Sequence, residues 1–164
     1  MQKTLVKRPE IKLIGITCRT QNSAEMDPTT AKIGPTIQHY FQNTLPSKIP
    51  NPKKPSITYC VYTEYESDFT GAYTYFIGEE VTSLDDVPEG FSSLIIPAQN
   101  YVVFTNQPGA MPAVCIDMWQ KIWTMTAADF GGERAYRADF EIYDQRASDP
   151  HNTVLDIFIG LREM

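Results

Sequence analysis

The sequence contains few of the residue types that build metal or nucleophilic sites. Its 164 residues include three cysteines and two histidines. Cys18, Cys60 and Cys115 are odd in number, form no Cys-x-x-Cys pair and lie in apolar segments, which favours buried thiols in a reducing compartment. Neither His39 nor His151 has a partner at metal-ligand spacing. The sequence therefore predicts no metal site and offers no nucleophile paired with a histidine.

Long hydrophobic runs are also absent. No apolar stretch approaches the ~20 residues that a membrane span needs. The N-terminus, from Met1 to Leu5, lacks the continuous apolar core of a signal peptide. We therefore expect a soluble, cytoplasmic protein with no membrane partner.

Positive charge is sparse and scattered. The 14 Lys and Arg residues against 20 Asp and Glu residues give a net charge of −6. The densest basic group, Lys48, Lys53 and Lys54, lies in a proline-rich stretch that is typical of a solvated loop. Because nucleic-acid binding relies on clustered Lys and Arg, we expect no direct contact with DNA or RNA. The pair Gly131-Gly132 matches no phosphate-binding fingerprint, and no cofactor is indicated.

A repeat at half the chain length is the clearest positive signal. Phe76-Ile77-Gly78 returns as Phe158-Ile159-Gly160, an offset of 158 − 76 = 82 in a chain of 164. With 42% hydrophobic and 12% aromatic residues, the chain can build a real core. We expect one domain over 1–164, made of repeat 1 (about 8–82) and repeat 2 (about 90–164).

Both halves show the same predicted order of elements, β-α-β-β. Gly34 and Pro35 mark the start of the first helix, because proline suits a first helical turn. The segments 21–28 and 127–133 are expected to be loops. Strands are predicted at 11–20, 56–65, 72–81, 91–105, 137–143 and 153–161, and helices at 34–45 and 114–123.

The two halves align at this offset, with a one-residue gap in the hairpin loop. Glu141 then stands where the first half has a small apolar side chain, so it marks a difference between the halves. The alignment places Ile37 on Trp119, Phe41 on Trp123, Gly15 on Pro97, Tyr62 on Tyr143 and Cys60 on Glu141.

The strand that carries Glu141 has two distinct faces. Asp139, Glu141 and Tyr143 share one face, and Phe140 and Ile142 share the other, which is expected to face the core. Two interpretations of the acidic face remain open: an exposed strand face, or one wall of a cleft.

The chain has more large aromatic residues than a core of this size needs. Some of them must be ordinary core, and Trp123 has the strongest claim to it. Aromatic walls around one carboxylate suit a lipophilic cation, since ring faces attract cations and a dry carboxylate recruits one. The candidates are Tyr73, Tyr75, Tyr101, Phe104, Trp119 and Trp123, with Tyr143 beside Glu141.

Several motifs together resemble a known family. The hairpin at 62–78 carries a Y-x-x-Y-x-x-D-x-x-G-x-Y…I-G pattern, and Phe140-Glu141-Ile142-Tyr143 forms an F-E-x-Y strand. The segments 96–104 and 155–161 add an I-P-A-x-x-Y-x-x-F stretch and a closing strand. In this order the motifs resemble the AraC-type effector-binding domain, also described as the gyrase-inhibitor-like fold.

The resemblance implies an α+β fold with a pseudo-twofold duplication of a β-α-β-β unit. Its curved antiparallel sheet would carry two main helices, with a ligand cleft between the repeats. Glu141 matches the glutamate that contacts cationic, lipophilic, aromatic compounds in multidrug-binding members. The chain resembles a free-standing member without a DNA reader, so regulation would need a protein partner that carries one.

Three functions remain open from the sequence. The first is a small-molecule-binding module for lipophilic, cationic aromatic ligands, with Glu141 as counter-charge and no catalytic residues. The second is a small-molecule hydrolase in which Glu141 and Tyr143 act as general base and acid. The third is a gyrase-inhibitor-like protein that binds another protein through the acidic run Glu79-Glu80…Asp85-Asp86.

Overall fold

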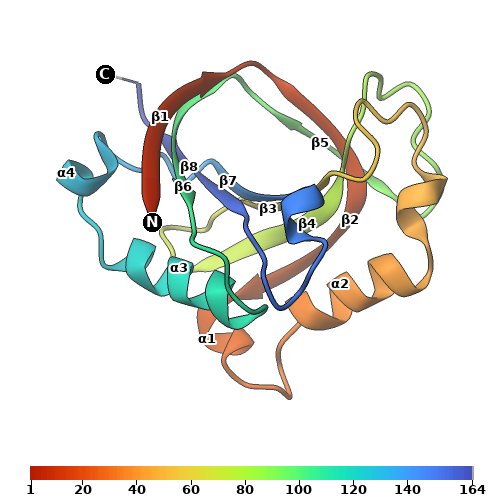
Figure 1. Cartoon of the computed structure of the whole chain (residues 1–164). Coiled ribbons are helices and arrows are strands. Elements are labelled where there is room, and N and C mark those ends of the chain that lie inside the picture. The colour runs from red at the N-terminus through yellow and green to blue at the C-terminus, as the bar shows by residue number, and fades with distance from the viewer. Residues whose placement is uncertain (164) are drawn as a thin grey trace.

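The computed structural model describes residues 1–163 and shows one curled, eight-stranded antiparallel sheet (Figure 1). Two main helices, α2 (Ile33–Gln42) and α3 (Ala113–Trp123), lie on one side of it. This confirms the predicted α+β class. The strands are β1 (Gln2–Arg8), β2 (Ile11–Gln21), β3 (Thr58–Thr63), β4 (Ala72–Glu80), β5 (Ser92–Ile96), β6 (Gln99–Thr105), β7 (Ala138–Tyr143) and β8 (Asp156–Leu161). Short helical turns are α1 (Asn22–Glu25), α4 (Ala127–Phe130), η1 (Leu45–Lys48) and η2 (Gln145–Ala147).

The order of strands is the same outward from the middle of the sheet in both halves. The order is β1-β6-β8-β7-β3-β4-β2-β5, so β7 and β3 are the central pair. Outward from β3 come β4 and β2, and outward from β7 come β8 and β6. In the central pair Cys60 lies directly opposite Glu141. This arrangement is compatible with a duplicated unit whose local axis passes between these two residues.

The predicted strand at 91–105 is wrong in one respect: it is two strands, β5 and β6. Proline cannot donate to the hydrogen-bond ladder, and the break falls at Pro97. The N-terminal segment is built in the same way, with Pro9 between β2 and the unpredicted β1. The two bent segments pair on both sides of the prolines, from Gln2 opposite Thr105 to Arg8 opposite Gln99 and from Ile11 opposite Ile96 to Gly15 opposite Ser92. They run side by side across the top of Figure 1 and curl the sheet.

Three further local predictions need correction. The presumed loops at 21–28 and 127–133 contain the short helices α1 and α4. The start of α4 carries a capping box between Thr126 and Asp129, a signal readable in the sequence. Phe41 was expected on the buried stripe of α2, but it is 51% exposed, whereas Tyr40 is fully buried.

The Phe-Ile-Gly repeat has a steric reason in the first half. Gly78 pairs with Gly15 where β4 meets β2. A Cβ on Gly15 would overlap the carbonyl oxygen of Ile77, so the backbones approach too closely for any side chain. In the second half Gly160 lies opposite Tyr101, so the register places Tyr101, not Pro97, at the position equivalent to Gly15.

Replacing Gly15 by alanine is therefore expected to lower the free energy of unfolding by about 1–3 kcal/mol, the usual cost of overpacking. Urea denaturation followed by circular dichroism measures it. The matched control is Gly34→Ala in α2, where a Cβ meets nothing within 4 Å. That control should stabilise the protein by up to about 1 kcal/mol. Equal effects of the two changes would contradict the close-approach explanation.

The apolar side chains form an inner cluster and two outer clusters. The inner cluster fills the curl of the sheet and contains Phe140 stacked on Phe158 at 4.6 Å between ring centroids. One outer cluster lies under α2 and the other under α3. Tyr62 and Tyr143 touch both outer clusters, so the space between the helices opens onto β3 and β7. Within residues 1–163, no helix has the length and apolar character needed to cross a membrane.

Candidate ligand-binding site

A cavity of about 410 Å³ lies between α2 and α3, with the central strands as its floor. Most of its wall is apolar or aromatic. Glu141 is on the floor, and it is only 2% exposed. The wall includes Ile33, Gly34 and Ile37 from α2, Cys115, Ile116, Trp119 and Trp123 from α3, Tyr62 from β3, Tyr73 and Tyr75 from β4, and Tyr143 from β7.

Three neutral groups donate hydrogen bonds to the Glu141 carboxylate. The Trp119 indole N–H donates to Oε2 at 2.7 Å, and the Tyr62 hydroxyl donates to the same oxygen at 2.6 Å. The Tyr143 hydroxyl donates to Oε1 at 2.5 Å. Tyr62 and Tyr143 are the pair that the repeat alignment equates, so the two halves hold the carboxylate from both sides.

The charge of Glu141 has no counter-ion in the part of the chain that the structure describes. None of the ion pairs among residues 1–163 includes it. Burial, followed by the Glu141 charge, raises the pKa of Tyr62 and Tyr143 well above the usual tyrosine value. Both hydroxyls therefore remain protonated donors at neutral pH.

Asp139, two residues earlier on the same face of β7, is a useful contrast. Its Oδ2 lies 2.7 Å from Arg134 Nη2, and both side chains are almost fully buried. The Tyr65 hydroxyl donates to Oδ2 at 2.5 Å, and the Gly160 N–H donates to Oδ1 at 2.7 Å. Of the two buried carboxylates on β7, Asp139 is thus neutralised by Arg134, whereas Glu141 has no such partner among residues 1–163.

The thiols near the cavity are poor nucleophiles. Cys115 Sγ lies 3.5 Å from the Tyr143 hydroxyl oxygen, whose single hydrogen is donated to Glu141. Burial and the nearby Glu141 charge raise the pKa of Cys115 and Cys60 above the usual cysteine value. Among residues 1–163 no group of three or more His, Cys, Asp or Glu side chains could hold a metal ion.

The structure brings together six of the eight candidate site residues. Trp123, which had the strongest claim to the core, lies in the wall and stacks on Phe69 with 6.0 Å between ring centroids. The residues that share the cavity are Glu141, Tyr143, Trp119, Tyr73, Tyr75 and Trp123.

Tyr101 and Phe104 lie outside the cavity, so their inclusion is corrected. Tyr101 points into the curl of the sheet and packs against Phe140 and Phe158. Phe104 faces the helix side of β6, but Phe130 of α4 covers it. Both residues lie on the strand that precedes α3 in the sequence, and the pairing of β6 with β1 and β8 places them away from the cleft.

Several wall residues were not among the candidates. Tyr62 shares a face of β3 with Cys60 and aligns with Tyr143, so the repeat contained the signal. Arg134, Phe69 and Glu25 lie in loops or short turns, where no periodic pattern points to them. Glu25 accepts hydrogen bonds from the N–H groups of Lys32 and Ile33 at the start of α2.

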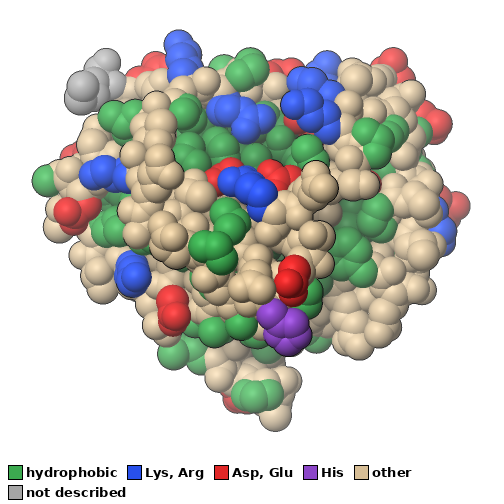
Figure 2. Space-filling model, in the orientation of Figure 1, with side chains coloured by type: hydrophobic (Ala, Val, Ile, Leu, Met, Phe, Trp, Pro, Cys, Tyr) green, Lys and Arg blue, Asp and Glu red, His purple; other side chains and the backbone are tan. Residues whose placement is uncertain are grey.

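A second, wider cleft of about 1020 Å³ adjoins this cavity at Ile37, Met111 and Tyr143. It lies between α2 and the connection from β7 to β8. Figure 2 shows hydrophobic side chains in a recess above the position of α2. The wall of the wider cleft is formed by apolar residues of α2, by the segment 55–57 and by the turn 144–150.

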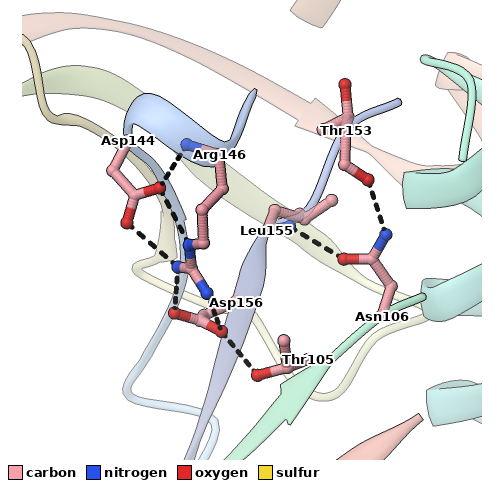
Figure 3. Close-up of polar contacts among 7 residues, drawn as sticks. All are labelled: Thr105, Asn106, Asp144, Arg146, Thr153, Leu155 and Asp156. Carbon is pink, nitrogen blue, oxygen red and sulfur yellow. Dashed lines mark hydrogen bonds and ion pairs between the residues drawn. The ribbon is translucent and has the colours of Figure 1, made fainter. Parts of the chain in front are cut away.

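The β7–β8 connection is firmly held by polar contacts (Figure 3). Arg146 Nη2 lies 2.6 Å from Asp156 Oδ2, and its Nε lies 3.0 Å from Asp144 Oδ1. Asn106 donates to the Thr153 carbonyl at 2.8 Å and accepts from the Leu155 N–H at 2.8 Å. The far wall of the wider cleft is therefore built on a fixed loop.

Solved structures with this fold cover almost the whole chain. An integron cassette protein from the mobile metagenome of Vibrio cholerae has a TM-score of 0.77 and 32% identity, over 98% of this chain and 95% of that one. SAV2435 bound to tetraphenylphosphonium has a TM-score of 0.76 over 99% of this chain and 94% of that one. At 17% identity, the second likeness shows the fold alone.

Two curated relatives are named as transcriptional regulators. The candidate regulator YobU of Bacillus subtilis is 26% identical over 149 residues, which cover 91% of each chain. BrlR of Pseudomonas aeruginosa is 29% identical over 165 residues, which cover 98% of this chain but 56% of BrlR. The chain thus spans about half of BrlR and nearly all of YobU.

The family assignment follows from a match along nearly the full length. The model of the Cass2 family, described as integron-associated effector binding protein, matches residues 4–161. This agrees with the effector-binding resemblance in the hairpin and F-E-x-Y motifs. The chain belongs to the Cass2 family of integron-associated effector-binding proteins.

Proposed function

We propose that this protein binds lipophilic aromatic cations, with Glu141 as their counter-charge. The observation that carries the proposal is the environment of one side chain. Glu141 is 2% exposed, accepts hydrogen bonds from three neutral donors, and faces an aromatic cavity. Burying a carboxylate is costly unless a cation or a proton compensates it, so a bound cation would relieve that cost.

The cavity walls suit an organic cation rather than a small hydrated one. The centroid of the Tyr62 ring lies 4.9 Å from that of Trp119, in an edge-on contact, and 5.4 Å from that of Tyr75. Several rings therefore meet near the carboxylate. Each ring face contributes about 0.5–2 kcal/mol of cation–π attraction. Arg134 also reaches the wall, but its ion pair with Asp139 offsets its repulsion of a cation.

The relatives support a sensing role. The family is described as effector-binding, a structure of the same fold contains tetraphenylphosphonium, and two relatives are named as transcriptional regulators. We propose that ligand binding here is passed to a DNA-binding protein. The net charge of −6 disfavours direct contact of this chain with DNA.

Binding fits the site better than catalysis. The 2.5 Å contact between Tyr143 and Glu141 would suit an acid–base pair. However, two further donors occupy the same carboxylate, so a general base would have to give up hydrogen bonds to accept a proton. We therefore propose a non-enzymatic module.

The acidic run at 79–86, on which the inhibitor alternative depends, does not form a continuous acidic surface. Glu79 is buried, and Glu80 accepts a hydrogen bond from Tyr59 and pairs with Lys53. Asp85 and Asp86 remain exposed, which is too few charges to imitate a polyanion.

Two ions of the same shape and opposite charge test the proposal. Tetraphenylphosphonium should quench the tryptophan fluorescence saturably, because Trp119 and Trp123 line the cavity. Tetraphenylborate should bind at least about tenfold more weakly, because it meets the Glu141 charge with the wrong sign. Equal affinity for both ions would show a merely hydrophobic pocket, and no saturable binding of either would refute the proposal.

A further inference from the structure

Besides Asp139, a further buried carboxylate lies on the same side of the sheet as Glu141. On β4, Tyr73, Tyr75, Ile77 and Glu79 alternate toward the helices, whereas Phe76 points into the curl. Glu79 is only 4% exposed. Its neighbour Glu80 points the other way and is held by Tyr59 and Lys53. Glu79 is thus separated from the surface charges beside it.

Glu79 has few internal partners. Within residues 1–163 it forms no ion pair with a Lys, Arg or His side chain. Burial raises the pKa of Glu79, and the backbone N–H of Ser56 only partly opposes that effect. Besides burial, the Glu79 charge raises the pKa of the neighbouring Tyr40, whose buried hydroxyl has no hydrogen-bond partner among the described residues.

The Glu79 side chain faces a hollow rather than packed protein. A cavity of about 550 Å³ is lined by Glu79 together with Phe41, Pro55 and Thr58. The last three residues also line the wider cleft. That cleft in turn meets the Glu141 cavity at Ile37, Met111 and Tyr143. One mostly apolar path therefore joins two buried carboxylates.

The strand register gives the separation of Glu141 and Glu79 along the sheet. Glu141 lies opposite Cys60, and Cys60 lies opposite Ile77, two residues before Glu79 on the same face. Two strand spacings of ~4.8 Å and two residues of ~3.3 Å place the two Cα atoms about 12 Å apart. An extended linker across this distance would lie over Cys60, Thr58 and Tyr143.

We propose that Glu79 is a second cation subsite, and that the protein prefers elongated dications whose positive groups lie about 12 Å apart. This inference rests on the proposed function, because it takes Glu141 as the first subsite. One cationic group would occupy the aromatic cavity and the other would face Glu79. The apolar cleft between them would hold the linker.

A series of simple probes tests the distance. Bis(trimethylammonium)alkanes from butane to dodecane, and alkyltrimethylammonium ions of equal chain length below their micelle concentrations, are titrated by calorimetry. Dications with octane to decane linkers should bind about tenfold tighter than the matching monocations. Butane and hexane linkers should show no such gain, because they cannot reach both carboxylates.

Substitution of Glu79 tests the subsite itself. Glu79→Gln should remove the gain of the long dications and leave monocation affinity within about twofold, which also shows that the variant is folded. The control Glu89→Gln makes the same change of charge at an exposed side chain and should keep the gain. Long dications that bind no tighter than monocations, or a gain that survives Glu79→Gln, would overturn the inference. Failure of tetraphenylphosphonium and every monocation to bind would instead refute the proposed function, and the inference with it.

Discussion

Replacing Arg134 by methionine is expected to lower the free energy of unfolding by about 3–5 kcal/mol, the usual cost of leaving one partner of a buried ion pair alone. Arg134 Nη2 lies 2.7 Å from Asp139 Oδ2, and the two side chains are 5% and 0% exposed. The guanidinium also lies over the Tyr136 ring at 4.2 Å. Without it, the buried Asp139 carboxylate would retain only Tyr65 and Gly160 as donors. Urea denaturation at neutral pH measures the loss.

A surface ion pair provides the control for this change. Arg162 lies 3.6 Å from Glu133, and both side chains are well exposed. Arg162→Met should therefore alter the free energy of unfolding by less than about 1 kcal/mol. Adding Asp139→Asn to Arg134→Met should recover part of the loss, because the uncompensated charge is then removed. A loss for Arg134→Met as small as that for Arg162→Met would show that the buried pair does not stabilise the fold.

Glu141→Gln is expected to weaken the binding of tetraphenylphosphonium by about 30- to 100-fold, or about 2–3 kcal/mol. The amide keeps the size of the carboxylate, and its oxygen can still accept from Trp119 or a tyrosine. The negative charge is what disappears, so binding should fall while the fold persists. Fluorescence titration measures the affinity. A cooperative thermal transition with a Tm close to that of the unmodified protein shows that the variant is folded.

Glu25 offers a matched control at the same cavity. Its carboxylate also lines the wall, but the N–H groups of Lys32 and Ile33 already oppose its charge. Glu25→Gln should therefore cost less than about threefold in affinity. If Glu25→Gln and Glu141→Gln weakened binding equally, general negative potential rather than a specific counter-charge would explain the attraction.

Much of the fold could be predicted from local patterns. The period-2 alternation located the strands that contain Cys60, Ile77 and Phe140, and helical spacing located α2 and α3. The bend at Pro97 was visible as a proline, but its consequence was not. Whether a proline marks an edge, a bulge or a complete break depends on which strand pairs beside it. That strand, β1, was not predicted because it has too few apolar residues to show an alternating pattern.

The candidate site was predicted in part. The contrast between Cys60 and Glu141 directed attention to β7, and the structure places these two residues opposite each other at the centre of the sheet. Tyr101 was wrongly assigned to the site because the pairing of β6 directs its ring into the inner cluster. Arg134 was missed because a loop residue makes no pattern, although it decides which of the two carboxylates on β7 is neutralised.

The sequence by itself determined the class of the fold, the Phe-Ile-Gly tripeptide repeat, and the strand face that Glu141 shares with Tyr143. These follow from local geometry, since alternation and helical period depend only on neighbouring residues. The tertiary structure alone decided that Glu141 is buried with no counter-ion among residues 1–163 while Asp139 meets Arg134, and that Glu79 opens onto the same path. Those facts depend on which distant segments come into contact, and electrostatic energy depends on the distances and burial that such contacts create.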